Sequence, residues 1–258
     1  NMTEISSNKI YSRSSNKLDE ITSKESSKSI FISQEKNFAN NHGFHYRSSA
    51  QFYFVVDKLK GINTRIILFN YFLLKNKNQV AICVTLRDKE GCFIDRKNID
   101  FQDQSVIILD KDFWVLDNHL GSVEVEYFSL KNLVIPYAAV IGAYETKLGI
   151  SYIHTYSRCY SKHELETGFT VMESCESNWT IRDSKEIESF TVIHNGHIDM
   201  DEQKMNIKII SESGRVLEKK HLLKSLKPYE IVEIIPRKIF DNLSDWLNNE
   251  QANCSIEF

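Results

Sequence analysis

The sequence predicts an all-β protein: two tandem antiparallel β-sandwich (Ig-like) units, joined by an extra strand pair, after a polar N-terminal tail. Three observations support this class. Apolar and polar residues alternate with a period of two in several short segments, as in half-buried strands. Polar turns separate these segments. No long stretch shows the spacing of an amphipathic helix, so the strands are expected to pair with one another and form sandwiches.

The first sandwich is expected at residues 48–135. Its segment VAICVTL (80–86) places β-branched and Leu side chains on one strand face, because side chains alternate along a strand. The segment GSVEVEYF (121–128) alternates again, with Glu124 and Glu126 opposite a Val/Tyr face. A strand with alternating glutamates is usually half solvated, so these two are expected to face water and not to act as an acid–base pair.

The second sandwich is expected at residues 179–258, because the pattern of the first recurs there. The segment AICVTLRDKEGCFI (81–94) matches NIKIISESGRVL (206–217), which places Gly91 on Gly214. Both glycines follow polar residues between two strand-like segments. The match therefore predicts two hairpins of the same design.

The two copies end differently. VEVEYF in the first copy corresponds to CSIEF in the second, which places Glu126 on Glu257. The second copy stops there, whereas the first continues into a connecting strand pair and loop at 136–178. Either the chain is a fragment or the second sandwich lacks its last strands, and the sequence leaves both interpretations open.

The amino-acid composition indicates which kinds of binding partner and which cellular compartment are expected for the chain. Residues 1–47 are rich in Ser, Asn and Lys with few apolar positions, which is typical of a flexible tail. The formal net charge is −3, so the basic character that drives nucleic-acid binding is missing. No apolar leader begins the chain, and no apolar run approaches the ~20 residues of a membrane span. The five cysteines, odd in number and without C-x-x-C spacing, favour a cytoplasmic protein without deciding its compartment.

The segment GISYIHTYSRCYSKHELE (149–166) has the most unusual chemistry in the chain. As a strand followed by a loop, it places a row of Tyr, His and Arg side chains on one face. Tyr rings stack on sugars, Arg binds carboxylate or phosphate, and His donates, accepts or ligates a metal. The residues expected to contact a ligand are Tyr152, His154, Tyr156, Arg158, His163 and Glu164.

Three interpretations of this face remain open. In the first, the face packs between the two sandwiches. In the second, it contacts a carbohydrate, an anionic ligand or a protein. In the third, it forms a metal-assisted catalytic site with His163 and Glu164. The chain has no G-x-S-x-G elbow, no Gly-rich phosphate loop and no H-E-x-x-H helix. The missing signatures favour a non-catalytic binding or scaffolding protein over an enzyme, with no cofactor and with an oligomer allowed.

Two further histidine pairs are expected to be structural. His42 and His45 form an H-x-x-H in a segment rich in Asn and Ser without a nearby carboxylate, so a polar loop is favoured over a metal site. His194 and His197 flank the dipeptide Asn-Gly, which predicts a turn between two exposed side chains.

Overall fold

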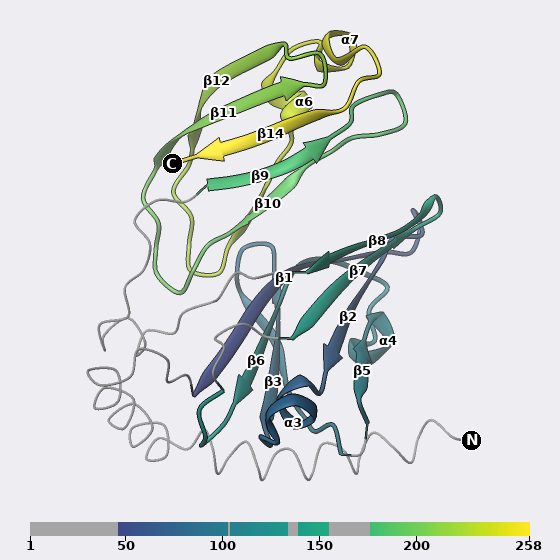
Figure 1. Cartoon of the computed structure of the whole chain (residues 1–258), viewed down its shortest axis with the longest axis vertical. Helices are drawn as coiled ribbons and strands as arrows, with labels where there is room; N and C mark the ends of the chain where they lie inside the picture. Colours follow the sequence, from purple (N-terminus) through teal and green to yellow (C-terminus); the bar gives the residue numbers. More distant parts are fainter. Residues whose placement is uncertain (1–45, 103, 134–138, 155–175) are drawn as a thin grey trace. The chain divides into compact units, whose positions relative to one another are not determined.

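The chain folds into strands joined by turns and short helices, as a computed structural model of residues 1–258 shows (Figure 1). Among the residues that the structure describes, strands in four antiparallel sheets outweigh a few short helices, which confirms the all-β class. Contacts divide the chain into two compact units, residues 1–169 and residues 170–258. The structure describes residues 46–102, 104–133, 139–154 and 176–258. Within these ranges, no helix is long and apolar enough to cross a membrane.

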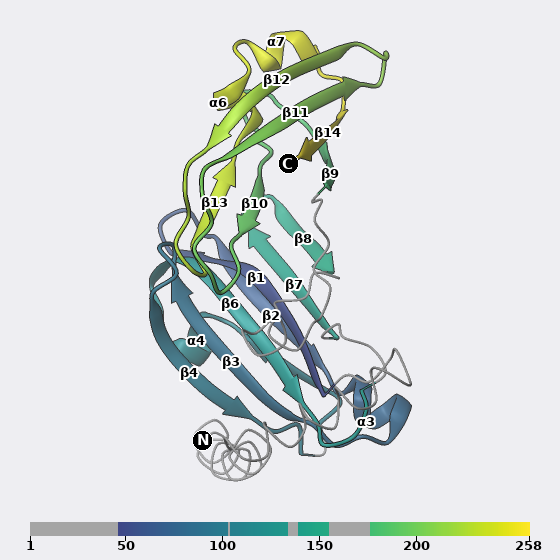
Figure 2. The ribbon, with the colours of Figure 1, turned by 90° about the vertical axis from the view of Figure 1, so that its left-hand side faces the viewer.

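The described part of the first unit contains two four-stranded sheets and two short helices. One sheet has the order β1-β6-β3-β4 and the other the order β5-β2-β7-β8 (Figure 2). The hairpin expected to connect the units thus supplies β7 and β8 to the second sheet of the first unit. In chain order the elements are β1 (Arg47–Asp57), β2 (Asn63–Phe69), α3 (Tyr71–Asn76), β3 (Ala81–Asp88), β4 (Phe93–Ile99), β5 (Val106–Leu109), α4 (Lys111–Trp114), β6 (Asn118–Phe128), β7 (Val140–Thr146) and β8 (Gly149–His154).

The two sheets of the first unit share one apolar core. The face predicted from VAICVTL is buried in this core, where it joins the Val/Tyr face of β6. The second sheet contributes residues of β2, β5 and β7, so the unit is a sandwich with apolar side chains between its sheets. Buried core residues include Phe52, Phe54, Ile66, Leu68, Ile82, Val84, Leu109, Val123, Val125, Tyr127 and Val140.

Gly142 allows β7 to approach β1 closely, and this contact gives a first prediction. A Cβ atom at Gly142 would lie 2.9 Å from Cδ1 of Phe52. Gly142→Ala is therefore expected to lower the free energy of unfolding by about 1–3 kcal/mol in urea titrations, because it overpacks the core. Gly196→Ala is the matched control, since a Cβ there would meet no atom within 4 Å. Equal losses in the two variants would contradict the prediction.

The second unit has a four-stranded sheet of order β12-β11-β14-β9 and a two-stranded sheet of β10 and β13. Its apolar core lies among these strands and two short helices. In chain order the elements are β9 (Glu176–Ile181), β10 (Thr191–His194), β11 (Gln203–Ser211), β12 (Val216–Leu223), β13 (Ile231–Ile234), α6 (Pro236–Ile239), α7 (Leu243–Leu247) and β14 (Ala252–Glu257).

The four-stranded sheet of the second unit repeats the strand order of the first. Strands β1-β6-β3-β4 correspond in order to β9-β14-β11-β12. The registers agree as well, because Glu126 lies opposite Cys83 and Glu257 lies opposite Asn206, 123 positions further along (206 − 83). The sequence match of VEVEYF with CSIEF therefore holds residue by residue in this sheet.

The two matched hairpins also have the same turn. Gly91 and Gly214 both have φ near 82°, a left-handed conformation that favours glycine. Gly91 donates its N–H to the carbonyl of Asp88, and Gly214 donates to that of Ser211, at 3.1 and 2.9 Å. The predicted equivalence of the two glycines is confirmed.

Candidate functional site

The described part of the predicted site is β8. It pairs with β7 through a two-residue turn, with Tyr152 opposite Ala143 and His154 opposite Ile141. Every residue of β8 is exposed, and Tyr152 is 66% exposed. Tyr152 and His154 share a strand face by alternation. The other residues expected to contact a ligand, Tyr156, Arg158, His163 and Glu164, lie outside the described residues.

Tyr152 lies on the outer face of its sheet. On β7, Gly142 points toward Phe52 of the opposite sheet, and the hydroxyl of Tyr144 donates to the carbonyl of Tyr53 at 2.9 Å. Ala143, one position along, therefore points away from the sandwich core, and so does Tyr152 beside it.

The outer face beside β8 is largely apolar. Ile108 of β5, Ile67 of β2 and Ile141 of β7 are paired in one row across the sheet. At the other end of β7, Glu145 forms an ion pair with Arg65 at 2.9 Å. Arg65 lies in the row of Tyr152 and Glu145 lies opposite Ile150, so a ligand on this face would meet aliphatic side chains, Tyr152 and His154 beside one Arg–Glu ion pair.

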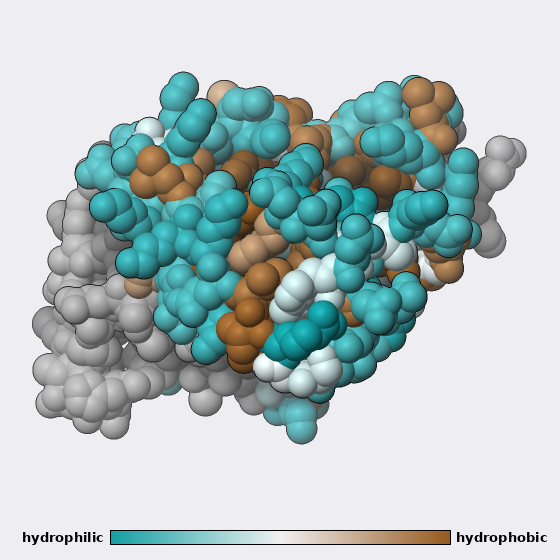
Figure 3. Space-filling model, turned by 90° about the horizontal axis from the view of Figure 1, so that it is seen from above, coloured by the Kyte–Doolittle hydropathy of each residue, from teal (hydrophilic) through white to brown (hydrophobic). Residues whose placement is uncertain are grey.

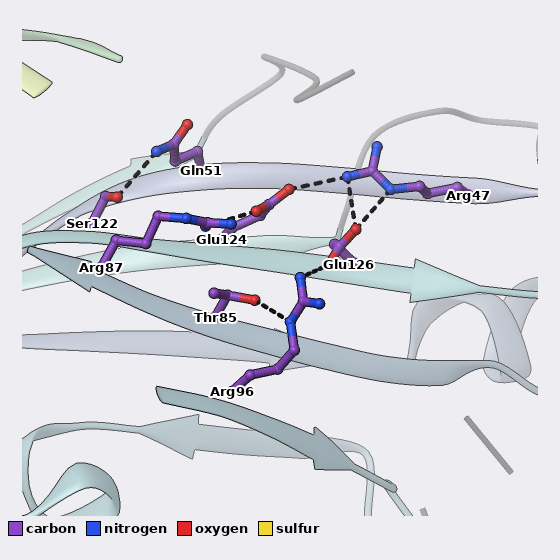
Figure 4. A network of polar contacts seen from close by, with 8 residues as sticks. All are labelled: Arg47, Gln51, Thr85, Arg87, Arg96, Ser122, Glu124 and Glu126. Atoms are coloured by element: carbon purple, nitrogen blue, oxygen red, sulfur yellow. Dashed lines mark hydrogen bonds and ion pairs between the residues drawn. The ribbon is translucent and has the colours of Figure 1, made fainter. Parts of the chain in front are cut away.

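The expectation that Glu124 and Glu126 face water is wrong. They are 3% and 8% exposed, on the face of β6 opposite the apolar core. Arg47 Nη2 donates to Glu124 Oε1 at 3.0 Å, and Arg87 Nη1 donates to Glu124 Oε2 at 2.8 Å (Figure 4). Arg47 Nε donates to Glu126 Oε1 at 2.9 Å, and Arg96 lies 3.4 Å from Glu126 Oε2. The flanking strands β1, β3 and β4 thus neutralise both carboxylates.

Burial governs the chemistry of this charge network. The pKa of Glu126 is raised by burial and by the neighbouring Glu124, while Arg47 and Arg96 oppose the rise. Burial also raises the pKa of the adjacent Cys83 thiol to about 12. A thiol of such a pKa remains protonated at neutral pH and is a poor nucleophile. The network is therefore suited to holding the four strands β1, β6, β3 and β4 together, and the corresponding Glu257 of the second unit is exposed.

The expectation that His194 is exposed is also wrong. His194 is the last residue of β10, where it pairs with Ile231, and it is only partly accessible. Its Nδ1 atom is buried without a hydrogen-bond partner. Burial lowers the pKa of His194 to about 4, because a charged imidazole would lose its hydration there.

The metal-assisted alternative is not tested by the described residues. Among the described residues, no group of three or more His, Cys, Asp or Glu side chains could hold a metal ion. The His42/His45 pair and the separate His163/Glu164 pair both lie outside the described ranges.

The class of this chain follows from its own fold and site. It is an all-β protein whose first unit is a sandwich with an exposed strand, β8, at one edge of a sheet. No protein-family model, curated protein or solved structure matches the chain.

Proposed function

We propose that the chain is a non-catalytic β-sandwich binding or scaffolding protein, and that its contact surface is β8 with the outer face beside it. The observation that carries this proposal is the run of exposed apolar side chains around β8. Ile150 and Tyr152, on the outer face of β8, are 49% and 66% exposed; Ile153, on the other face of the strand, is 51% exposed, and Leu148 of the preceding turn is also exposed. Contiguous exposed apolar surface marks sites of protein interaction.

Single exposed apolar residues would not support such a proposal, because they are common on protein surfaces. On the face drawn in Figure 3, for example, apolar residues form several groups among hydrophilic ones. β8 differs from the edge strand β4, whose exposed Phe93 and Ile94 adjoin charged residues, because Ile150 and Tyr152 share one face of a strand without Asp, Glu, Lys or Arg.

A polypeptide is the ligand that fits this surface best. The described strand offers two isoleucines, a serine, Tyr152 and His154 but no Asp, Glu, Lys or Arg, and Arg65 on the face beside it already forms an ion pair with Glu145. An anion would need a cation, and a carbohydrate would need several polar partners for its hydroxyl groups. The residue that would supply the cation in those alternatives, Arg158, lies outside the described residues. The shared strand order further supports our inference that the two units are tandem Ig-like sandwiches.

Selection of peptides tests the binding proposal. Random peptides displayed on phage are selected against the immobilised full-length chain, and binders with dissociation constants of about 1–100 μM are expected. Tyr152→Ala should weaken their binding about fivefold or more, because it removes an exposed aromatic side chain from the contact.

Phe93→Ala is the matched control for Tyr152→Ala. Phe93 is a similarly exposed aromatic residue on β4, at the edge of the other sheet of the first unit. Its replacement should leave peptide binding unchanged. The proposal fails if no peptide is enriched, or if both variants weaken binding to the same extent.

A further inference from the structure

The edge strands of the sheets differ in the features that prevent them from pairing with a strand of another chain. An edge exposes backbone N–H and C=O groups that can pair with another strand, and charged side chains commonly prevent this. β4 carries Asp95, Arg96 and Lys97, and β12 carries Glu218, Lys219 and Lys220. β8 carries no charged residue between Gly149 and His154, no proline and no bulge. In the described part of the chain, no strand pairs with its second edge.

The register shows which backbone groups of β8 face that edge. The turn has two residues, so Thr146 and Gly149 form the closing pair of the hairpin. The closing pair of such a turn is hydrogen-bonded, and bonded and non-bonded pairs then alternate along the ladder. The odd-numbered residues of β8 therefore bond to β7. The N–H and C=O groups of Ile150 and Tyr152 point to the open edge.

We propose that this edge binds the β8 strand of a second copy of the chain, antiparallel and across a two-fold axis. This inference rests on the proposed function, since it names the polypeptide that the β8 surface receives. With Ser151 opposite its symmetry copy, Ile150 of each chain faces Tyr152 of the other. Each such pair exchanges two backbone hydrogen bonds, which gives four in total. The Ile and Tyr side chains meet on the outer face as aromatic–aliphatic cross-strand pairs.

The chemistry of β8 favours a second β8 as its occupant. The charged residues Arg65 and Glu145 on this face already pair with each other, so a charged peptide would lose hydration without gaining an unpaired ion, whereas β8 has no Asp, Glu, Lys or Arg and has the same length. A two-fold pairing also uses both open β8 edges, so the assembly closes as a dimer. The other uncharged edge of the same sheet, β5, has four residues and offers a shorter pairing.

Solution mass of the full-length chain tests the dimer. Sedimentation over a range of concentrations should show a reversible monomer–dimer equilibrium. Ile150→Lys should raise the dimer dissociation constant about tenfold or more, because the ammonium group would lie against an apolar partner strand. Ile150 is exposed, so the melting temperature should remain close to that of the wild type. Val216→Lys, the same kind of change at an exposed position of β12, should leave the dimer unchanged.

Cross-linking tests the register. Ser151 and its symmetry copy would form a non-hydrogen-bonded pair with Cα atoms about 4.5 Å apart, a distance that a disulfide spans. Oxidised Ser151→Cys should therefore yield a covalent dimer, and Lys220→Cys on β12 should not. Both are made with Cys92→Ser, Cys159→Ser and Cys175→Ser, because Cys92 is an exposed thiol and the other two cysteines lie outside the described residues.

Three results would overturn the inference. One is a chain that remains monomeric at all concentrations, and another is a dimer that Ile150→Lys leaves intact. The third is a series of larger species that Ile108→Lys on β5 abolishes, because it would indicate pairing of β8 with β5. A monomeric chain that still binds selected peptides through Tyr152 would refute the dimer and leave the proposed function standing. Loss of both self-association and peptide binding would refute both.

Discussion

Replacing Glu124 by Gln is expected to lower the free energy of unfolding by about 3–5 kcal/mol, because it removes the buried negative charge that Arg47 and Arg87 share. Glu124 accepts hydrogen bonds from Arg47 and Arg87 at 3.0 and 2.8 Å, and all three side chains are nearly inaccessible to water. Gln keeps the shape of Glu but loses the negative charge, and its amide group would face a guanidinium donor. Urea unfolding of the wild type and the variant measures the difference.

Glu145→Gln is the matched control for Glu124→Gln. Glu145 also pairs with an arginine, Arg65, at 2.9 Å, but both side chains are partly exposed. A surface ion pair contributes about 0–1 kcal/mol, so this variant should lose little stability. Similar losses at Glu124 and Glu145 would show that burial of the network adds nothing to its importance.

Acidification from about pH 6.5 to pH 4 is expected to destabilise the second unit by up to about 3 kcal/mol through His194 alone. The pKa of His194 is lowered to about 4 in the folded chain by burial, from an ordinary value of 6.5. Between these values the unfolded chain binds more protons than the folded chain, so stability falls as the pH falls. The stabilisation from keeping His194 neutral is fully present above pH 6.5, the pKa of the unfolded chain. It is lost as the pH falls through about 4, the pKa in the folded chain.

A variant without the titrating group isolates this effect. His194→Phe keeps a planar ring at the end of β10 and removes the imidazole. Unfolding free energies of both proteins are measured from pH 7 to pH 4, where carboxylates contribute equally to each. The wild type should lose more stability than the variant by about 2–3 kcal/mol. Parallel curves would show that His194 is not protected from protons in the folded chain.

The buried strand face and the glycine positions in turns could be predicted from the sequence, because both depend only on neighbouring residues. The period of two in VAICVTL placed its apolar residues on one face, and the structure buries that face. Gly91 and Gly214 could be matched because the same hairpin turn requires a left-handed residue in both units. The strand order of the two matched sheets agrees with that match.

The environment of a polar face could not be predicted in this way. Alternation indicated that Glu124 and Glu126 lie opposite the core but not whether that face is exposed. Their partners Arg47 and Arg87 come from strands 77 and 37 residues away in the chain. The sequence shows that Arg47 and Arg87 lie near strand ends. Only the strand order shows that these ends lie beside Glu124. The burial of His194 likewise depends on a strand distant in sequence, because His194 pairs with Ile231.

The sequence by itself determined which residues of β8 share a face, because side-chain direction along a strand depends only on the backbone period. Tyr152 and His154 therefore share one face whichever strand lies next to β8. Only the tertiary structure decided that β8 is the last strand of its sheet, that Tyr152 points away from the core, and that Ile150 and Tyr152 present backbone groups to an open edge. These properties depend on pairing with β7 and on the order of strands distant in sequence. No local pattern encodes them.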